Sequence, residues 1–225
     1  MGKYLVGLDE GTTGCKTCVF DFDGKLIGED YREYKCYYPK PGWVEQKAED
    51  ITPALYASVK QAIANSGVDP KDIVAIGLSS QGSVCSMIDE KGNLLRDFIG
   101  WQDVRAQKIE QAEILSKISN DEFYEITGDP LGFTLSACRI VWMKNNEPEL
   151  WNKMFKLVSH QEYFLKEFGA DDYYTDLSSA SRMSICDVNN HIWSQKMIDV
   201  YQLKEEQLPI IVTDPGKVVA KIDQR

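Results

Sequence analysis

The stretch from Tyr4 to Val19 combines the residue types of a phosphate-binding turn. Two apolar runs flank a turn of small and hydroxyl residues, Gly11, Thr12, Thr13 and Gly14, with Asp9 before it and Lys16 after it. Small residues let the backbone approach a phosphate, whose oxygens accept hydrogen bonds from N–H and hydroxyl groups. Asp9 can hold a hydrated Mg²⁺, and Lys16 can offset negative charge. The pattern differs from a Walker A loop and from a dinucleotide fingerprint, and it predicts a hairpin that binds the phosphates of ATP rather than a plain turn.

A second polar cluster follows a strongly apolar segment. Ile73–Leu78 is almost continuously apolar, which predicts a strand covered on both faces. Short polar side chains follow it and suit a polyhydroxylated ligand, because ligands of open α/β sheets bind where strands end. These residues are Ser79, Ser80, Gln81, Gly82 and Ser83. Capping of the strand end by serines is the alternative interpretation.

Two further clusters have the same two interpretations. Trp101 offers a flat apolar wall for a sugar, with Gln102 and Asp103 as polar neighbours, whereas Asp103 and Arg105 could equally form a structural pair. Asp176 precedes three serines at positions 178, 179 and 181. A turn capped by its own side chains explains that cluster slightly better than a ligand contact does.

The elements that would carry these clusters form a mixed α/β pattern. Strands are predicted at 4–8, 16–21, 25–31 and 73–78, and a further hairpin at 84–88 and 94–99. Helices are predicted at 51–65, 104–118, 121–126, 137–144, 161–168 and 194–201. The order predicts a mixed sheet that begins with an antiparallel meander.

Composition excludes several functional classes. The 225 residues carry a net charge of −10 without a compensating basic cluster, which argues against a nucleic-acid or anionic-membrane partner. The pattern contains neither a signal peptide nor a membrane span, so a cytoplasmic protein is predicted. Six scattered cysteines are expected to be free thiols, the pair Cys15 and Cys18 included. His160 and His191 are assigned no chemistry.

Taken in order along the chain, these motifs resemble the FGGY family of carbohydrate kinases within the actin-like ATPase superfamily. The landmarks are GLDEGTTGCK from Gly7, PGWVEQ from Pro41, IGLSSQGS from Ile76, GWQDVR from Gly100, Thr127-Gly128 with Trp142, and TDLSSAS from Thr175. Xylulose kinases and glycerol kinases typically carry Gln-Met-His-Gly and Gln-Arg-Glu, respectively, where this chain has Gln81-Gly82-Ser83. The chain therefore matches neither substrate signature, and its resemblance to a xylulose kinase-like N-terminal domain leaves the acceptor open.

The resemblance implies a fold and an activity. The fold would be a ribonuclease H-like α/β domain, with a five-stranded mixed sheet and helices on both faces, that spans residues 1–225. The full-length enzyme would transfer the γ-phosphoryl group of ATP to a hydroxyl of a sugar or polyol, a ketopentose being favoured. Asp9 would orient Mg²⁺, and Gly11, Thr12, Thr13 and Lys16 would hold phosphate oxygens. The acceptor would lie against Ser80, Gln81, Gly82, Ser83, Trp101, Gln102, Asp103 and Asp176.

The resemblance also implies parts that this chain lacks. Family members are about twice as long, and a C-terminal domain supplies the adenosine pocket and the general-base aspartate. That domain is the expected partner of this chain, homodimers are common in the family, and the isolated chain is expected to be inactive. A non-catalytic sugar-binding or regulatory module is the alternative function. Another actin-like ATPase, such as a chaperone or filament protein, is the third and weakest.

Overall fold

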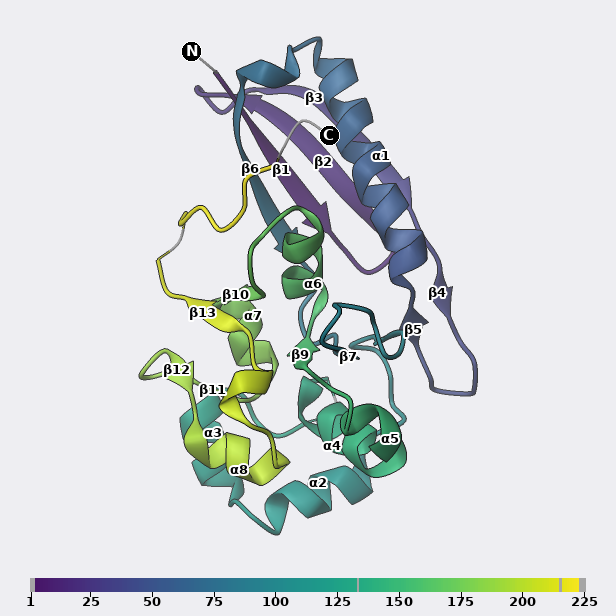
Figure 1. The fold of residues 1–225 in the computed structure, drawn as a ribbon, viewed down its shortest axis with the longest axis vertical. Helices are drawn as coiled ribbons and strands as arrows, with labels where there is room; N and C mark the ends of the chain where they lie inside the picture. Colours follow the sequence, from purple (N-terminus) through teal and green to yellow (C-terminus); the bar gives the residue numbers. More distant parts are fainter. Residues whose placement is uncertain (1–2, 133, 215, 223–225) are drawn as a thin grey trace. The chain divides into compact units, whose positions relative to one another are not determined.

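The computed structural model describes residues 3–132, 134–214 and 216–222 (Figure 1). The chain divides into two compact units. Unit 1 comprises Met1–Cys36 and Gln46–Gln81, and unit 2 comprises Tyr37–Glu45 and Gly82–Arg225. The short strands β4 (Cys36–Tyr37) and β5 (Glu45–Gln46) lie at two of the three points where the chain passes between the units, and the third falls between Gln81 and Gly82.

Unit 1 is built on a mixed sheet of four strands in the order β3-β2-β1-β6. The strands are β1 (Tyr4–Glu10), β2 (Gly14–Asp21), β3 (Leu26–Glu33) and β6 (Ile73–Ser80). Strand β2 runs antiparallel to both β1 and β3, whereas β6 runs parallel to β1. The predicted opening meander and the mixed character of the sheet are confirmed.

One helix covers the sheet of unit 1. Helix α1 (Ala48–Ser66) packs against β2 and β3 and leads through the short 3₁₀ helix η1 (Pro70–Asp72) into β6. Its buried side is formed by Ile51, Leu55, Ser58 and Ala62, spaced three or four residues apart as one helix face requires. Thr17 of β2 meets this face, and its hydroxyl lies 2.6 Å from the Ser58 hydroxyl. The helix predicted at 51–65 is confirmed.

Three details of the predicted sheet are not confirmed within the described residues. The largest sheet has four strands, not five, because the segment after Gly82 enters unit 2. Strand β6 lies at the edge of the sheet, and Val74 is 51% exposed rather than covered. A continuous apolar run cannot by itself distinguish a central strand from an edge strand. Helix α1 is the one α-helix among the described residues of unit 1, so helices on both faces are not found there.

Unit 2 is made of short elements around a larger core. Its helices are α2 (Lys108–Leu115), α3 (Asn120–Thr127), α4 (Ser136–Asn146), α5 (Pro148–Trp151), α6 (His160–Glu167), α7 (Leu177–Arg182), α8 (Gln195–Tyr201) and the 3₁₀ helix η2 (Glu205–Gln207). Its strands are β7 (Ser86–Ile88), β8 (Phe98–Ile99), β9 (Lys156–Val158), β10 (Tyr174–Asp176), β11 (Cys186–Asp187), β12 (Ile192–Trp193) and β13 (Ile210–Val212). The pairs β7–β9 and β11–β12 are antiparallel, and β10–β13 is parallel. The predicted hairpin survives as two antiparallel bridges, Cys85 to Ile99 and Ile88 to Leu94.

Helix α4 occupies the core of unit 2. Seven consecutive or nearly consecutive residues of α4 are buried: Ser136, Ala137, Cys138, Arg139, Ile140, Val141 and Met143. A helix that is buried on nearly all sides must place any charged residue in the interior, and Arg139 is fully buried. Helix α2 packs against α4, where Glu113 accepts a hydrogen bond from the Lys144 ammonium at 2.7 Å.

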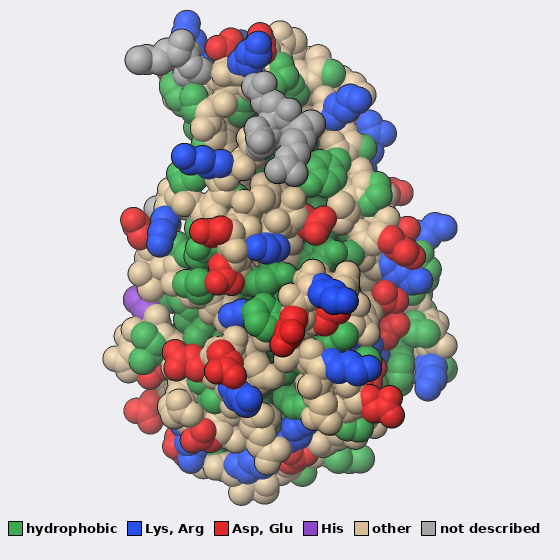
Figure 2. All heavy atoms as spheres, in the orientation of Figure 1, with side chains coloured by type: hydrophobic (Ala, Val, Ile, Leu, Met, Phe, Trp, Pro, Cys, Tyr) green, Lys and Arg blue, Asp and Glu red, His purple; other side chains and the backbone are tan. Residues whose placement is uncertain are grey.

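The remaining observations concern the cysteines, possible metal ligands, membrane-spanning helices and surface charge. All six cysteines are free, as predicted. Among the described residues, no cluster of three or more His, Cys, Asp or Glu side chains could hold a metal ion. Within the part of the chain that the structure describes, the helices are too short or too polar to cross a lipid bilayer. Figure 2 shows Lys and Arg side chains scattered among Asp and Glu on the displayed face.

Candidate functional site

The β1–β2 turn of unit 1 is a tight hairpin, closed by a backbone hydrogen bond and packed closely against β3. The Gly11 N–H donates to the Gly14 carbonyl at 2.9 Å. A Cβ on Gly14 would lie 2.5 Å from the Arg32 carbonyl oxygen and 2.6 Å from the Tyr31 hydroxyl. Only glycine fits there, since real Cβ contacts are not that short. The glycine is therefore required by the approach of β3 to the turn.

Cross-strand pairing aligns four polar side chains on the open face of this sheet. Asp9 of β1 pairs with Lys16 of β2 and with Ser79 of β6, and Lys16 pairs with Tyr31 of β3. Directly paired residues point to the same side of a sheet, and all four are exposed. We call Tyr31, Lys16, Asp9 and Ser79 the polar row. The predicted metal and phosphate residues Asp9 and Lys16 are thus brought together.

Lys16 is already engaged in an ion pair. Its ammonium lies 2.7 Å from the Glu29 carboxylate, and both side chains are about half exposed, at 48% and 49%. The hydrogen bond and the charge of Glu29 raise the pKa of Lys16, so it stays protonated. The pair is solvent-screened and weak, and Lys16 can exchange Glu29 for another anion at little cost.

The opposite side of the hairpin is braced by a residue that the sequence analysis did not single out. Glu10 is fully buried, and the Tyr34 hydroxyl contacts both its carboxylate and the Gly11 carbonyl oxygen. The Gln81 amide donates to the Glu10 carboxylate and to the Gly11 carbonyl, both at 3.0 Å. Burial and the nearby Glu10 carboxylate raise the pKa of Tyr34. Strand alternation, which puts Asp9 out and Glu10 in, is the signal that could have identified Glu10.

The two threonines differ in their surroundings. The Thr12 carbonyl accepts a hydrogen bond from the Gln46 amide at 2.9 Å and lies 3.4 Å from the Cys36 sulfur. Thr13 is exposed, and its hydroxyl lies 3.5 Å from the Tyr31 hydroxyl. The backbone at Thr12 is therefore fixed, while the Thr13 hydroxyl stands at the surface beside the polar row.

The predicted acceptor residues of unit 1 lie on the side of Glu10. Ser80 pairs with Glu10 in the sheet, so its side chain points away from Asp9. Gln81 is held against Glu10 and Gly11, as described above. Ser79, the first residue of the same cluster, belongs to the polar row instead.

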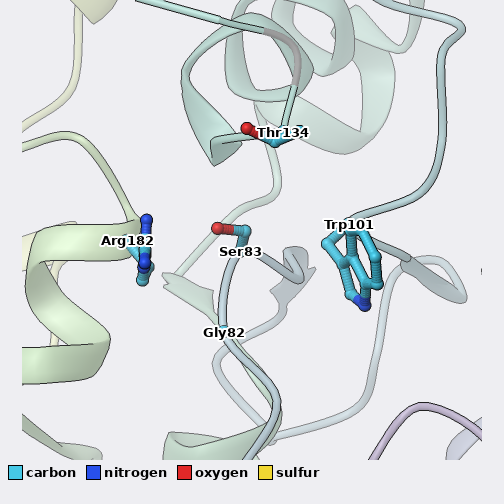
Figure 3. A pocket seen from close by; sticks show the side chains of 5 residues that line it. All are labelled: Gly82, Ser83, Trp101, Thr134 and Arg182. Atoms are coloured by element: carbon cyan, nitrogen blue, oxygen red, sulfur yellow. The ribbon is translucent and has the colours of Figure 1, made fainter. Parts of the chain in front are cut away.

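Unit 2 contains a pocket of about 360 Å³ that brings together three of the predicted acceptor residues. Gly82, Ser83 and Trp101 line it, together with Thr134 and Arg182, which the sequence analysis missed. Figure 3 shows Trp101 and Arg182 on opposite sides of Ser83. The volume is within the range of small-molecule sites. An indole wall, two hydroxyls and a guanidinium suit a compact polar ligand.

Arg182 and Gly82 are in close contact at one wall of this pocket. A Cβ on Gly82 would lie 3.0 Å from the Arg182 side-chain Cγ. The Arg182 guanidinium pairs with the Asp129 carboxylate at 3.2 Å and remains half exposed. No local pattern marks Arg182 or Thr134 for this role, since both lie far along the chain from Gly82.

Asp103 lies in the interior and is not among the residues that line the pocket. It is fully buried, and its carboxylate accepts hydrogen bonds from the Val44 N–H at 2.5 Å and from the Arg105 guanidinium at 2.8 to 3.0 Å. Arg105 also pairs with Glu45 at 2.8 Å and stacks 3.7 Å from the Trp43 ring centre. The structural pair that the sequence allowed for Asp103 and Arg105 is present. Gln102 is exposed and does not line the pocket.

Asp176 caps a helix. Its side chain accepts hydrogen bonds from the Ser179 N–H at 2.7 Å and the Ser178 hydroxyl at 2.9 Å, at the start of α7. Burial alone would raise the pKa of Asp176, but these hydrogen bonds and those of Gln161 lower it. The turn-capping interpretation describes this geometry, and Asp176 is not among the residues that line the pocket.

Comparison with known proteins shows the family to which this chain belongs. The family description "FGGY family of carbohydrate kinases, N-terminal domain" matches residues 4–225, so the chain belongs to this family. A glycerol kinase of Trichodesmium erythraeum is 33% identical over 93% of this chain and 42% of its own length. A xylulose kinase and a gluconate kinase of Lactobacillus acidophilus are each 26% identical, with TM-scores of 0.86 and 0.83, over 99% of this chain and 44% of theirs. The chain thus spans less than half the length of these relatives.

Proposed function

We propose that this chain is the acceptor-binding part of an ATP-dependent carbohydrate kinase that transfers the γ-phosphoryl group to a hydroxyl of a sugar or polyol. One observation carries the proposal: the Asp9 carboxylate stays exposed in the polar row while Glu10 braces the same hairpin from the buried side. An exposed carboxylate beside a glycine-containing turn suits a metal-bound phosphate, because the carboxylate can hold the metal and the turn lets backbone N–H groups approach the phosphate.

The residues of the hairpin fit a magnesium-bound nucleotide. Asp9 would hold Mg²⁺ through water, and the exposed Thr13 hydroxyl, the Gly11–Thr12 backbone and Lys16 would hold phosphate oxygens. When bound, Mg²⁺ neutralises the charge that develops on the transferred group. Lys16 would leave Glu29 to do so, which the weak exposed pair permits.

The pocket of unit 2 would hold the acceptor. Trp101 would support an apolar face of the carbon chain, while Ser83, Thr134 and Arg182 would bind hydroxyl groups. Gln81 and Asp103 would act on the site indirectly, because Gln81 holds the Gly11 carbonyl of the hairpin, Asp103 holds the Val44 N–H, and neither lines the pocket. The general base and the adenosine pocket would come from a C-terminal domain of the complete enzyme.

Two acceptor classes compete within this proposal. A ketopentose fits the xylulose kinase likeness in structure and the pocket of about 360 Å³. Glycerol is the second candidate, because the 33% identical relative is a glycerol kinase. Gly82 places no side chain at the pocket wall, which leaves room for the larger acceptor.

The test is acceptor-dependent ADP release by the complete gene product with Mg²⁺-ATP. We expect turnover with a ketopentose or another polyol from a panel that includes glycerol and gluconate. Asp9→Asn should lower kcat by about 100-fold or more, since the metal loses its anionic partner. The control Asp23→Asn, at an exposed acid in the β2–β3 turn, should change kcat less than about two-fold.

Three results would count against the proposal or a part of it. Acceptor binding by the complete product without any turnover would favour the alternative of a sugar-binding or regulatory module. Equal activity of Asp9→Asn and Asp23→Asn would remove the polar row from the reaction. Robust turnover by the 225-residue chain alone would contradict the assignment of the general base to another domain.

A further inference from the structure

A buried arginine links the backbone of three segments that line the unit 2 pocket. Arg139 is fully buried in α4. Its guanidinium donates to the carbonyl oxygens of Ser83 at 2.5 Å, Thr134 at 3.2 Å and Trp101 at 3.5 Å. Each acceptor residue also contributes to the wall of the pocket. Arg139 itself is not among the lining residues.

Two of the three segments are also joined by the Cys85–Ile99 bridge, and the Arg139 guanidinium connects both of them to the third. Ser83 lies between β6 and β7, Trp101 follows β8, and Thr134 precedes α4. Their carbonyls are 56, 38 and 5 positions from Arg139 in the chain. A planar guanidinium with five N–H donors can bind several carbonyls at once, whereas an ammonium is a point charge on a flexible stem. The fork therefore ties the Thr134 segment to the two segments that the Cys85–Ile99 bridge joins, and it holds the carbonyls of all three from one side chain.

The backbone at Ser83 shows that one of these loops needs support. Ser83 has φ of +59°, in the left-handed region that side chains other than glycine rarely adopt. Such a residue persists only where its surroundings hold it in place. The short hydrogen bond from Arg139 to its carbonyl is a contact of that kind. It holds the Ser83 side chain at the pocket wall, between Trp101 and Arg182 (Figure 3).

We propose that Arg139 is the positioning residue of the acceptor pocket: its guanidinium holds Ser83, Trp101 and Thr134 in register from behind, without touching the acceptor. The proposal rests on the function proposed above, because it assigns this pocket to the phosphoryl acceptor. A displacement of the bound substrate by about 1 Å is enough to weaken catalysis strongly. Arg139 should thus control the KM for the acceptor while leaving the nucleotide site unchanged.

The experiment compares Arg139→Met with Lys156→Met in the complete gene product. Lys156 is a matched control, since it is also a buried cation (8% exposed) that donates to a backbone carbonyl, that of Leu208 at 2.8 Å. It does not line the pocket. For Arg139→Met we expect the acceptor KM to rise about 10- to 100-fold and the ATP KM to stay within about two-fold. For Lys156→Met both constants should stay within about two-fold.

A second readout does not depend on activity. Hydrogen exchange should accelerate in peptides that cover 82–86, 100–104 and 134–138 of Arg139→Met, and not in the same peptides of Lys156→Met. Arg139→Lys retains the charge but lacks the rigid fork of five donors, so its acceptor KM should be intermediate. If Arg139→Met does not fold, Arg139→Lys provides the same two readouts.

The outcomes separate this proposal from the function on which it rests. Parallel rises in the acceptor and ATP KM values, or equal exchange in the Arg139 and Lys156 variants, would overturn the positioning role while leaving the kinase intact. Absence of acceptor-dependent turnover in the wild type would overturn the proposed function. In that case faster hydrogen exchange confined to the three peptides of Arg139→Met would still support the positioning role of Arg139, and unchanged exchange would refute it.

Discussion

Substitution of Asp103 tests whether this residue binds the acceptor or stabilises the fold. The sequence predicts an acceptor-binding aspartate, whereas the structure buries its carboxylate completely between the Val44 N–H and the Arg105 guanidinium. The two interpretations predict opposite results for Asp103→Ala. If Asp103 binds the acceptor, its loss should raise the acceptor KM and leave the stability of the fold unchanged. If Asp103 is a buried structural residue, its loss should lower the stability of the fold before it affects the acceptor KM.

The size of the effect follows from what Asp103→Ala leaves behind. Arg105 is 1% exposed, so loss of Asp103 strands a buried cation, a class of change that costs about 3–5 kcal/mol. Glu45 remains 2.8 Å from Arg105 and 15% exposed, which favours the lower end, about 3 kcal/mol. In a unit of this size that loss lowers Tm by about 6–12 °C.

The assay is urea and thermal unfolding of Asp103→Ala, Arg105→Met and the double variant. Arg105→Met removes the stranded charge, so the double variant should be more stable than the sum of the single changes predicts, by about 1–3 kcal/mol. An unchanged Tm in Asp103→Ala together with an acceptor KM raised at least ten-fold would refute the structural reasoning and restore the predicted ligand role.

Two further predictions concern the hairpin and the α2–α4 contact. Gly14→Ala forces a Cβ to within 2.5 Å of the Arg32 carbonyl, so it should lower the free energy of unfolding by about 1–3 kcal/mol and raise the ATP KM. Gly77→Ala, with open space around its Cβ, is the control. Similar stability of the two variants would contradict this account. Glu113 is partly buried, which raises its pKa, but hydrogen bonds from Lys144, Asn145 and Lys117 lower it to about 2. Its contribution, about 1 kcal/mol after allowance for solvent screening, is present above pH about 4.5 and lost as pH falls towards 2. Acid titration of unfolding should show this loss in the wild type and not in Glu113→Gln.

Local chemistry made several features predictable. The hairpin turn, the helix face of α1 and the free cysteines follow from neighbours in the chain, because turn residues, helix period and cysteine spacing act over a few positions. The family resemblance, rather than the residue types alone, placed Gly82, Ser83 and Trp101 beside one acceptor, and all three line the pocket of unit 2. The edge position of β6 was not, since apolar content measures burial tendency and says nothing about which strand is last in a sheet.

The sequence by itself determined which residues can do chemistry: an acid and a glycine-threonine turn for a phosphate, and an indole with short hydroxyls for a polyol. The tertiary structure decided how they are used. Gln81 and Asp103 bind partners 71 and 59 positions away, and Arg139 gains its role from carbonyls on three segments. A side chain's function depends on which atoms packing brings within hydrogen-bond distance, and residues so far apart in the chain leave no local pattern that shows it.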